Sequence, residues 1–410
     1  MRPVPDLDTA IDRVVDSGNC SGCGACTLLD PGLRMRLAPD GFNRPVRAAA
    51  GTAAPDAVAR FRALCPGVQV AAQVPEGARR HPTMGPFLQA FEAWATDPEI
   101  RFAGSSGGTL TALAAWLASI GEASFVVGSG PDHGDPRRTT TVRVTGRSQA
   151  LAQAGSRYGP ASNAADPGAL DPAAAFIGKP CEVSAIRVMT RAASGETGAQ
   201  PLLLSFFCAG TPSQRATDAL VDELGVPASE RLADLWYRGH GWPGRFTAHR
   251  TDGSTVSASY EESWGRSLGP AVQWRCKVCA DGVGESADLT AADLWRADAR
   301  GYPDFTDAPG VSALIARTRR GLDVVTRAVA AGVLAVRPID IDELAAVQPL
   351  QRHRRETLAG RLLGTAVAGG RIPRYRGFSL LRLAFSQPRE SLRVARGAYR
   401  RRRAHGNTDD

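Results

Sequence analysis

The sequence has very little lysine and histidine and no long apolar run. Only Lys179 and Lys277 among its 49 basic residues are lysines, and its 410 residues include six histidines. No run of about 18 or more apolar residues occurs, so we expect no transmembrane helix. The first residues contain no apolar signal-peptide core, so we expect a cytoplasmic protein. With 43% hydrophobic and 22% charged residues, the composition excludes a disordered chain and predicts two or three globular domains.

Acidic residues are scarce only towards the C-terminus. The net charge is +8, but residues 351–410 hold 15 arginines and four acidic residues, which leaves residues 1–350 at −3. A body without net positive charge argues against nucleic-acid binding. We expect the Arg-rich segment 341–410 to be helical, and within it we expect residues 373–403 to pack an apolar side on the body and to hold their arginines in solvent. The alternative is peripheral contact with an anionic membrane surface or with an acidic redox partner.

Eight cysteines stand out against this background. In a large chain expected in the cytoplasm, free thiols are more typical of a metal or redox site than of a disulfide framework. Four of them follow the pattern C-x2-C-x2-C and then, after a long gap, Cys-Pro: Cys20, Cys23, Cys26 and Cys65. Glycines within the loop let each thiolate reach a different iron of a cuboidal cluster. Zinc sites usually combine two C-x2-C pairs or add histidines, so the pattern predicts a [4Fe–4S] cluster.

The other four cysteines are dispersed along the chain. They amount to one full ligand set for a second cluster: Cys181, Cys208, Cys276 and Cys279. The alternative is two buried structural cysteines beside a small zinc knuckle or a redox C-x-x-C pair. Each of the two lysines lies within two residues of one of these cysteines, where a compact positive charge would favour a reduced, more negative centre.

The order of apolar and helix-periodic segments predicts the order of elements. A hairpin is expected across residues 30–46, and a helix within residues 52–72 that carries Cys65 at its end. A linker is expected near residues 74–86. Beyond it, strands alternate with helices, which favours an α/β core with parallel strand pairing. Residues 232–260 interrupt that alternation and predict an antiparallel insertion.

A segment rich in glycine and serine, GSSGG, precedes an apolar helix-like run. Ser105, Ser106 and Thr109 are expected to cap the start of that helix. Gly107 and Gly108 permit a close approach of the backbone, and a loop of this kind can hold a phosphate. The segment matches neither a Walker motif nor GxGxxG, so the alternative is a plain capped helix.

Several segments, in this order, resemble one family. They are CSGCGAC with its distant CP, GSSGGTLTALAAWL, GSRY, GKPCEVSAIR, FFCAGTPS, YRGHGWPG and RCKVCADGVGESADLTAADLW, which span roughly residues 18–320. The chain thus resembles the beta subunit of coenzyme F420 hydrogenase/dehydrogenase, a family related to 7-hydroxymethyl chlorophyll a reductase. It departs from that family at Ala292, which stands where a glycine usually precedes the aspartate, here Asp293.

The resemblance implies an iron–sulfur flavoprotein oxidoreductase with FAD and two [4Fe–4S] clusters, the second held near the flavin by the dispersed cysteines. Tyr158 is a candidate proton donor. The resemblance implies cofactor-binding roles for residues of the GSSGG loop, of GSRY and for one lysine: Ser106, Gly107, Gly108, Thr109, Ser156, Tyr158 and Lys179. Lys277 is a further cofactor-binding candidate because its charge would favour a reduced flavin or cluster.

The fold class that we expect is α/β with mixed α+β character. A small N-terminal ferredoxin-like iron–sulfur module precedes an α/β core that binds flavin and the second cluster, and a basic helical tail follows. The expected units are residues 1–80 for the [4Fe–4S] module, 86–170 for the flavin loop, 171–340 for the second cluster and 341–410 for the tail.

Electrons would pass between the clusters, the flavin and an organic partner, which is either coenzyme F420 or a substrate reduced through ferredoxin. Ferredoxin or a partner oxidoreductase subunit is the expected redox partner. Two other interpretations stay open. The chain could be an accessory electron-relay subunit without a substrate of its own, or a zinc-stabilised binding protein, which would be colourless.

Overall fold

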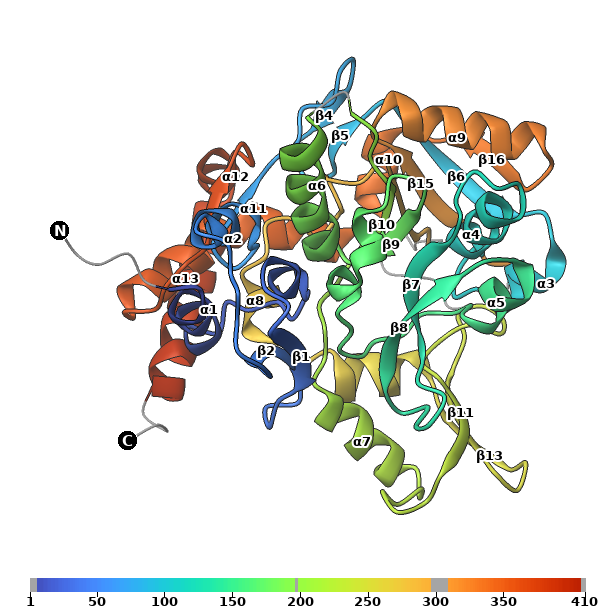
Figure 1. The fold of residues 1–410 in the computed structure, drawn as a ribbon, viewed down its shortest axis with the longest axis horizontal. Coiled ribbons are helices and arrows are strands. Elements are labelled where there is room, and N and C mark those ends of the chain that lie inside the picture. The colour runs from blue at the N-terminus through green and yellow to red at the C-terminus, as the bar shows by residue number, and fades with distance from the viewer. Residues whose placement is uncertain (1–5, 196–197, 296–308, 407–410) are drawn as a thin grey trace.

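The centre of the molecule is an eight-stranded mixed sheet in the order β16-β6-β15-β14-β10-β9-β7-β8 (Figure 1). The structure is a computed structural model and describes residues 6–195, 198–295 and 309–406. The strands are β6 (Gln89–Ala95), β7 (Val126–Pro131), β8 (Thr139–Val144), β9 (Ala175–Gly178), β10 (Leu202–Phe206), β14 (Leu289–Asp293), β15 (Ser312–Ala316) and β16 (Leu334–Pro338). Strands β7, β9, β10 and β14 are parallel, as predicted. The pairs that flank them are antiparallel, which the alternation of segments did not predict.

Both faces of the sheet are covered. Neighbouring residues of the apolar strand β10 point to opposite sides: Leu204 joins a core with α4 and α9, and Leu203 joins a core with the N-terminal helices and α6. The helices around the sheet are α3 (Pro98–Ala103), α4 (Thr109–Ser119), α5 (Arg147–Ala152), α6 (Pro180–Ser194) and α9 (Arg319–Ala330), with the short 3-10 helices η2 (Asn163–Ala165) and η3 (Pro167–Leu170). The fold is therefore of the mixed α/β class.

The N-terminal region packs beside α6. Its elements are α1 (Leu7–Asp16), η1 (Ala25–Leu29), β1 (Leu33–Leu37), β2 (Asn43–Arg47), α2 (Ala57–Leu64), β3 (Gln69–Ala71), β4 (Arg79–His81) and β5 (Gly85–Phe87). The predicted hairpin is β1–β2, and Cys65 is the residue that ends α2, so both predictions are confirmed. The segment expected as a linker instead contains the hairpin β4–β5.

An insertion follows α7 (Gln214–Glu223). Strands β11 (Leu232–Trp236), β12 (Phe246–Arg250) and β13 (Thr255–Ala258) form an antiparallel sheet, which confirms the prediction for this region. The π-helix η4 (Glu261–Leu268) and the short helix α8 (Trp274–Lys277) lead back to the core.

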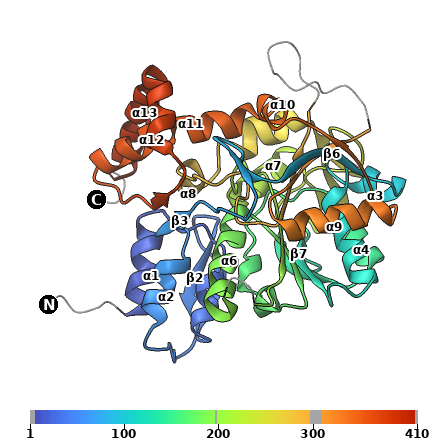
Figure 2. The same ribbon diagram turned by 90° about the horizontal axis from the view of Figure 1, so that it is seen from above.

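The C-terminal segment lies over the N-terminal region, with α11 and α13 side by side (Figure 2). Its elements are α10 (Ile341–Ala346), α11 (Pro349–Val367), β17 (Arg374–Arg376), α12 (Leu380–Ser386) and α13 (Pro388–Gly406). Strand β17 pairs in parallel with β3, which ties the end of the chain to its beginning. Within residues 373–403 the arginines are exposed, as expected, except Arg402, which is partly buried. Earlier in this segment, Arg354 and Arg355 of α11 are buried because they bond to core groups. Among the described residues, no helix has the length and apolar character needed to cross a membrane.

Candidate functional site

Two glycines shape the loop at residues 20–26. Gly22 and Gly24 have φ angles of +69° and +91°, which favour glycine. A Cβ atom on Gly24 would lie 2.7 Å from the side chain of Ala165 in η2. The loop therefore packs against its neighbour closely enough to present its cysteines from one compact turn.

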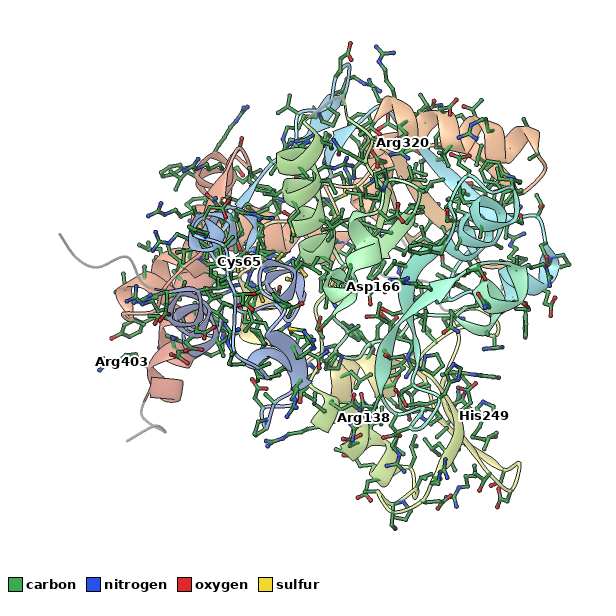
Figure 3. The ribbon with its side chains drawn as sticks, in the orientation of Figure 1. Cys65, Arg138, Asp166, His249, Arg320 and Arg403 are labelled. Carbon is green, nitrogen blue, oxygen red and sulfur yellow. The ribbon has the colours of Figure 1, made fainter. Side chains whose placement is uncertain are left out.

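The structure brings the first four cysteines together. Cys23 and Cys26 are buried, and Cys20 and Cys65 are partly buried. Burial raises the pKa of the Cys26 thiol well above its usual value, and the nearby Cys23, Cys20 and Cys65 raise it further. Cys65 lies at the end of α2, on the side of the molecule that the C-terminal helices cover (Figure 3). The four thiols are therefore neighbours in the fold.

Backbone N–H groups point at these sulfurs. The N–H of Gly67 lowers the pKa of the Cys65 thiol and that of Ala25 lowers the pKa of Cys23, although burial raises both pKa values overall. The N–H of Val68 donates to the carbonyl oxygen of Cys65 at 2.9 Å. N–H donors to sulfur stabilise thiolates and tune iron–sulfur centres. An all-sulfur donor set is the kind of ligand set that an iron–sulfur cluster requires.

The second four cysteines also converge, although they are distant in sequence. Cys181 lies in the first turn of α6, Cys208 follows β10, Cys276 lies in α8, and Cys279 follows α8. Burial raises the pKa of Cys208 to about 12, and the nearby Cys276 and Cys279 contribute. The N–H of Thr211 donates to the Cys276 sulfur at 3.3 Å.

Cys181 connects the two sets. Burial raises the pKa of its thiol well above the usual value, and Cys23 of the first set and Cys208 of the second both add to the increase. The two sets are therefore neighbours. Within the described parts of the chain, no three His, Cys, Asp or Glu side chains are arranged around a single metal ion.

A cavity of about 450 Å³ opens beside the second set. Its walls include residues at the carboxyl ends of the parallel strands β9, β10 and β14, the place where open α/β sheets commonly bind ligands. The volume suits a cofactor or small substrate. Of the residues predicted from the resemblance, six line it: Ser106, Gly108, Thr109, Ser156, Tyr158 and Lys179. Cys208 lines it as well.

Two predicted residues lie elsewhere. Gly107 packs against the sheet, where its N–H donates to the Ser312 hydroxyl at 3.0 Å. Lys277 is half-buried, and its Nζ donates to the carbonyl oxygen of Pro270 at 3.4 Å. Neither is among the described residues that line the cavity.

The predicted serine and threonine caps of α4 are wrong. The helix begins after Gly108, whose φ angle is +69°, and has no side-chain cap. Ser106 instead donates to the carbonyl oxygen of Val311 at 2.8 Å, and Ser105 accepts a hydrogen bond from Ser156 at 2.7 Å. The serines thus fix the loop to its neighbours, and the first N–H groups of α4 can bind a ligand anion.

Arg238 is a cavity residue that the sequence analysis missed. It is buried, and its Nη1 lies 2.5 Å from the Asp293 carboxylate. The rings of Trp242, Tyr260 and Trp295 surround its guanidinium, with centroids 5.1, 5.3 and 5.1 Å away. In the sequence, one feature could have marked Arg238 and Asp293 as site residues. Both lie in segments that carry the family resemblance, YRGHGWPG and LTAADLW.

Lys179 forms a buried ion pair with Glu182, the Nζ and Oε1 atoms being 2.7 Å apart. Burial lowers the pKa of Lys179, but Glu182 and the nearby Cys181 raise it, and the net shift is upward. Lys179 Nζ also donates to the carbonyl oxygen of Ala161 at 2.6 Å. The lysine is therefore a fixed positive charge in the wall between the cavity and the second cysteine set.

Glu182→Gln is expected to destabilise the chain by about 3 kcal/mol, because it leaves Lys179 as a buried charge without its carboxylate. The measurement is the free energy of unfolding in urea. Glu99→Gln is the matched control, since Glu99 pairs with Arg147 at the surface and its loss should change the free energy of unfolding far less. Equal losses in both variants would contradict the argument.

Two family models match the chain, and both describe the beta subunit of coenzyme F420 hydrogenase/dehydrogenase. The model of the N-terminal part of that subunit matches residues 90–165, and the model of its C-terminal part matches residues 172–342. A curated relative, the coenzyme F420 hydrogenase subunit beta of Methanococcus voltae, is 25% identical over 201 residues, or 47% of this chain. The match spans 64% of that relative's length.

A solved structure is similar in fold. It is a chain from the F420-reducing [NiFe] hydrogenase complex of Methanosarcina barkeri, with 20% identity and a TM-score of 0.50. The similarity covers 68% of this chain and 96% of that chain. At this identity the likeness concerns the fold alone.

Proposed function

The chain belongs to the family of coenzyme F420 hydrogenase/dehydrogenase beta subunits, and on that premise we propose that it is an iron–sulfur flavoprotein oxidoreductase. In this proposal, two [4Fe–4S] clusters lie on the two cysteine sets and FAD lies in the cavity. Electrons pass between the clusters, the flavin and an organic donor or acceptor.

One observation carries the proposal. Cys208 lines the cavity and also interacts with Cys276 and Cys279, while Cys181 interacts with both Cys208 and Cys23. A route of sulfur ligands thus leads from the cavity through the second set to the first. Such a chain of neighbouring centres is what one-electron transfer requires.

When bound, the flavin supplies the conversion between a two-electron hydride and the one-electron chemistry of the clusters. The chain's own residues hold and polarise that site. The uncapped start of α4 and the glycine-rich loop suit an anionic phosphate group. Lys179 provides a positive charge that favours added electrons. The hydroxyl of Tyr158 accepts a hydrogen bond from Arg238 at 3.4 Å and is a donor for a proton in the cavity.

We propose coenzyme F420 as the organic partner, because the family and its relatives are named for it. The test is anaerobic incubation of the loaded protein with reduced F420, followed by the absorbance of the oxidised deazaflavin. Oxidation coupled to reduction of the clusters supports the proposal. If a protein that contains both flavin and iron does not oxidise reduced F420, the result contradicts F420 as the partner and favours a substrate reduced through ferredoxin. Iron without flavin would favour the accessory relay subunit.

The redox partner is proposed to be ferredoxin or another acidic oxidoreductase chain, which would contact the basic C-terminal helices. Burial, Arg401 of α13 and Arg361 of α11 lower the pKa of Lys277, so several positive charges lie beside the helix α8 of Cys276. Arg403 also lies on α13, on the opposite side of the molecule from Arg320 (Figure 3). This places positive charge close to the proposed electron path.

Electron transfer with an acidic carrier is therefore expected to slow about tenfold between roughly 0.05 M and 0.5 M salt at subsaturating carrier. Replacing Arg401 and Arg403 by glutamine should weaken the salt dependence, and Arg320→Gln on α9 should not. A salt-independent rate, or binding of the helices to anionic vesicles in place of the carrier, would contradict this partner.

A further inference from the structure

Arg275 is a buried guanidinium between the two cysteine sets. Only 2% of the residue is exposed. Its Nη2 donates to the carbonyl oxygen of Pro66 at 2.7 Å, next to Cys65. Its carbon Cζ lies 5.8 Å from the ring centre of Tyr375, whose hydroxyl donates to the carbonyl oxygen of Val278. None of these groups carries a negative charge at neutral pH.

The rest of this guanidinium is unsatisfied. Nε and Nη1 of Arg275 are buried and have no hydrogen-bond partner among the described residues. No ion pair found in the described part of the chain includes Arg275. By contrast, Arg317 is equally buried, and its nitrogens all donate to oxygen atoms. Burying a charge with free donors is costly, so a negative acceptor is expected opposite Arg275.

Arg275 directly precedes Cys276 in α8, so it belongs to the element that carries the second cysteine set. Burial lowers the pKa of Arg275, but Tyr375 and three cysteines of that set, Cys279, Cys181 and Cys276, raise it, and the net shift is upward. A cluster on these thiolates carries negative charge and exposes sulfur acceptors, and its potential responds to hydrogen bonds and to nearby charge. The protein thus offers two unused N–H donors where such a cluster would need them.

We propose that Arg275 is the hydrogen-bond donor and counter-charge of the second iron–sulfur cluster, and that it raises the reduction potential of that cluster. The inference rests on the proposed function. Arg275 acts through the cluster and is a positioning and tuning residue. A fixed positive charge stabilises the reduced, more negative state over the oxidised one.

The test is a redox titration of the anaerobically loaded full chain, followed by electron paramagnetic resonance. In Arg275→Gln, the ratio of reduced to oxidised second cluster at a fixed potential is expected to fall at least about tenfold, or about 59 mV for a one-electron couple. Arg275→Lys keeps the positive charge. The logarithm of the ratio of reduced to oxidised cluster should therefore change less than half as much as in Arg275→Gln. Arg317→Gln is the control for loss of a buried arginine and should leave the potential unchanged.

A measurement on the unmutated protein covers the case in which the variants lose iron. Protein labelled with 15N in its arginine guanidinium groups should show a 15N hyperfine coupling in the reduced second cluster. An unchanged potential in Arg275→Gln, or the absence of that coupling, would overturn the role of Arg275 while leaving the proposed function intact. An unmutated chain that binds no iron would overturn both.

Discussion

Replacing Cys208 by serine is expected to halve the iron of the anaerobically purified chain, from about eight to about four atoms. Cys208 is the one cysteine of the second set that also lines the cavity, so its loss removes the cluster that would exchange electrons with a bound flavin. Flavin should stay bound but should no longer reduce the remaining cluster. Iron, labile sulfide and the rate of cluster reduction are the measurements.

Cys23→Ser is the matched variant. It should lower the iron content by the same amount, but it should leave the cluster beside the cavity and its reduction by flavin intact. A Cys208→Ser protein that keeps all of its iron would show that this thiol is not a ligand. A protein that loses both clusters in either variant would show that the two sets fold as one unit.

Replacing Gly128 by leucine is expected to reduce bound flavin at least about tenfold, because the side chain would occupy the cavity. Gly128 lines the cavity on β7, and a Cβ atom there would meet no other atom within 4 Å. The leucine can therefore be accommodated by the fold and still exclude the ligand. Flavin released by denaturing the protein, measured per chain, is the readout.

Gly146→Leu is the control for this substitution. Gly146 also has open space around its Cβ position, but it lies at the start of α5 and is not among the described lining residues. It should retain flavin at the level of the unmutated chain. Full flavin content in Gly128→Leu would mean that the flavin binds outside this cavity.

The cysteine sites show what sequence can and cannot predict. Cys20, Cys23 and Cys26 form a local pattern whose chemistry follows from spacing, and the turn built on Gly24 agrees with it. The dispersed set spans nearly a hundred residues, from Cys181 to Cys279, so spacing alone left zinc and structural roles open. The structure gathers these thiols, but the metal that they would bind stays a prediction.

The polar residues behind the site could not be predicted in the same way. Arg238 pairs with Asp293, and Arg275 contacts Pro66, across distances in sequence that no periodicity encodes. The serines of the GSSGG loop were expected as helix caps from their local pattern, yet Ser106 bonds to Val311 instead. In each case the partner of the side chain is a residue distant in sequence, which the local sequence pattern could not identify.

The C-terminal arginines show the same limit. Charge composition marks residues 351–410 as basic, and a surface helix is the simplest expectation. Arg355 is nevertheless buried against Glu285, at 2.5 Å, because the fold places α11 beside the buried segment that holds Glu285. An arginine of this segment is buried where the fold provides a buried acceptor such as the carboxylate of Glu285. The number of arginines in the segment does not reveal which of them that will be.

The most direct test of the account is one anaerobic sample of the full chain, analysed for its visible spectrum, iron, acid-labile sulfide and released flavin. The account predicts a brown protein with about eight irons, a matching amount of sulfide and one flavin per chain. A colourless protein that holds zinc and no sulfide after the same handling would contradict it.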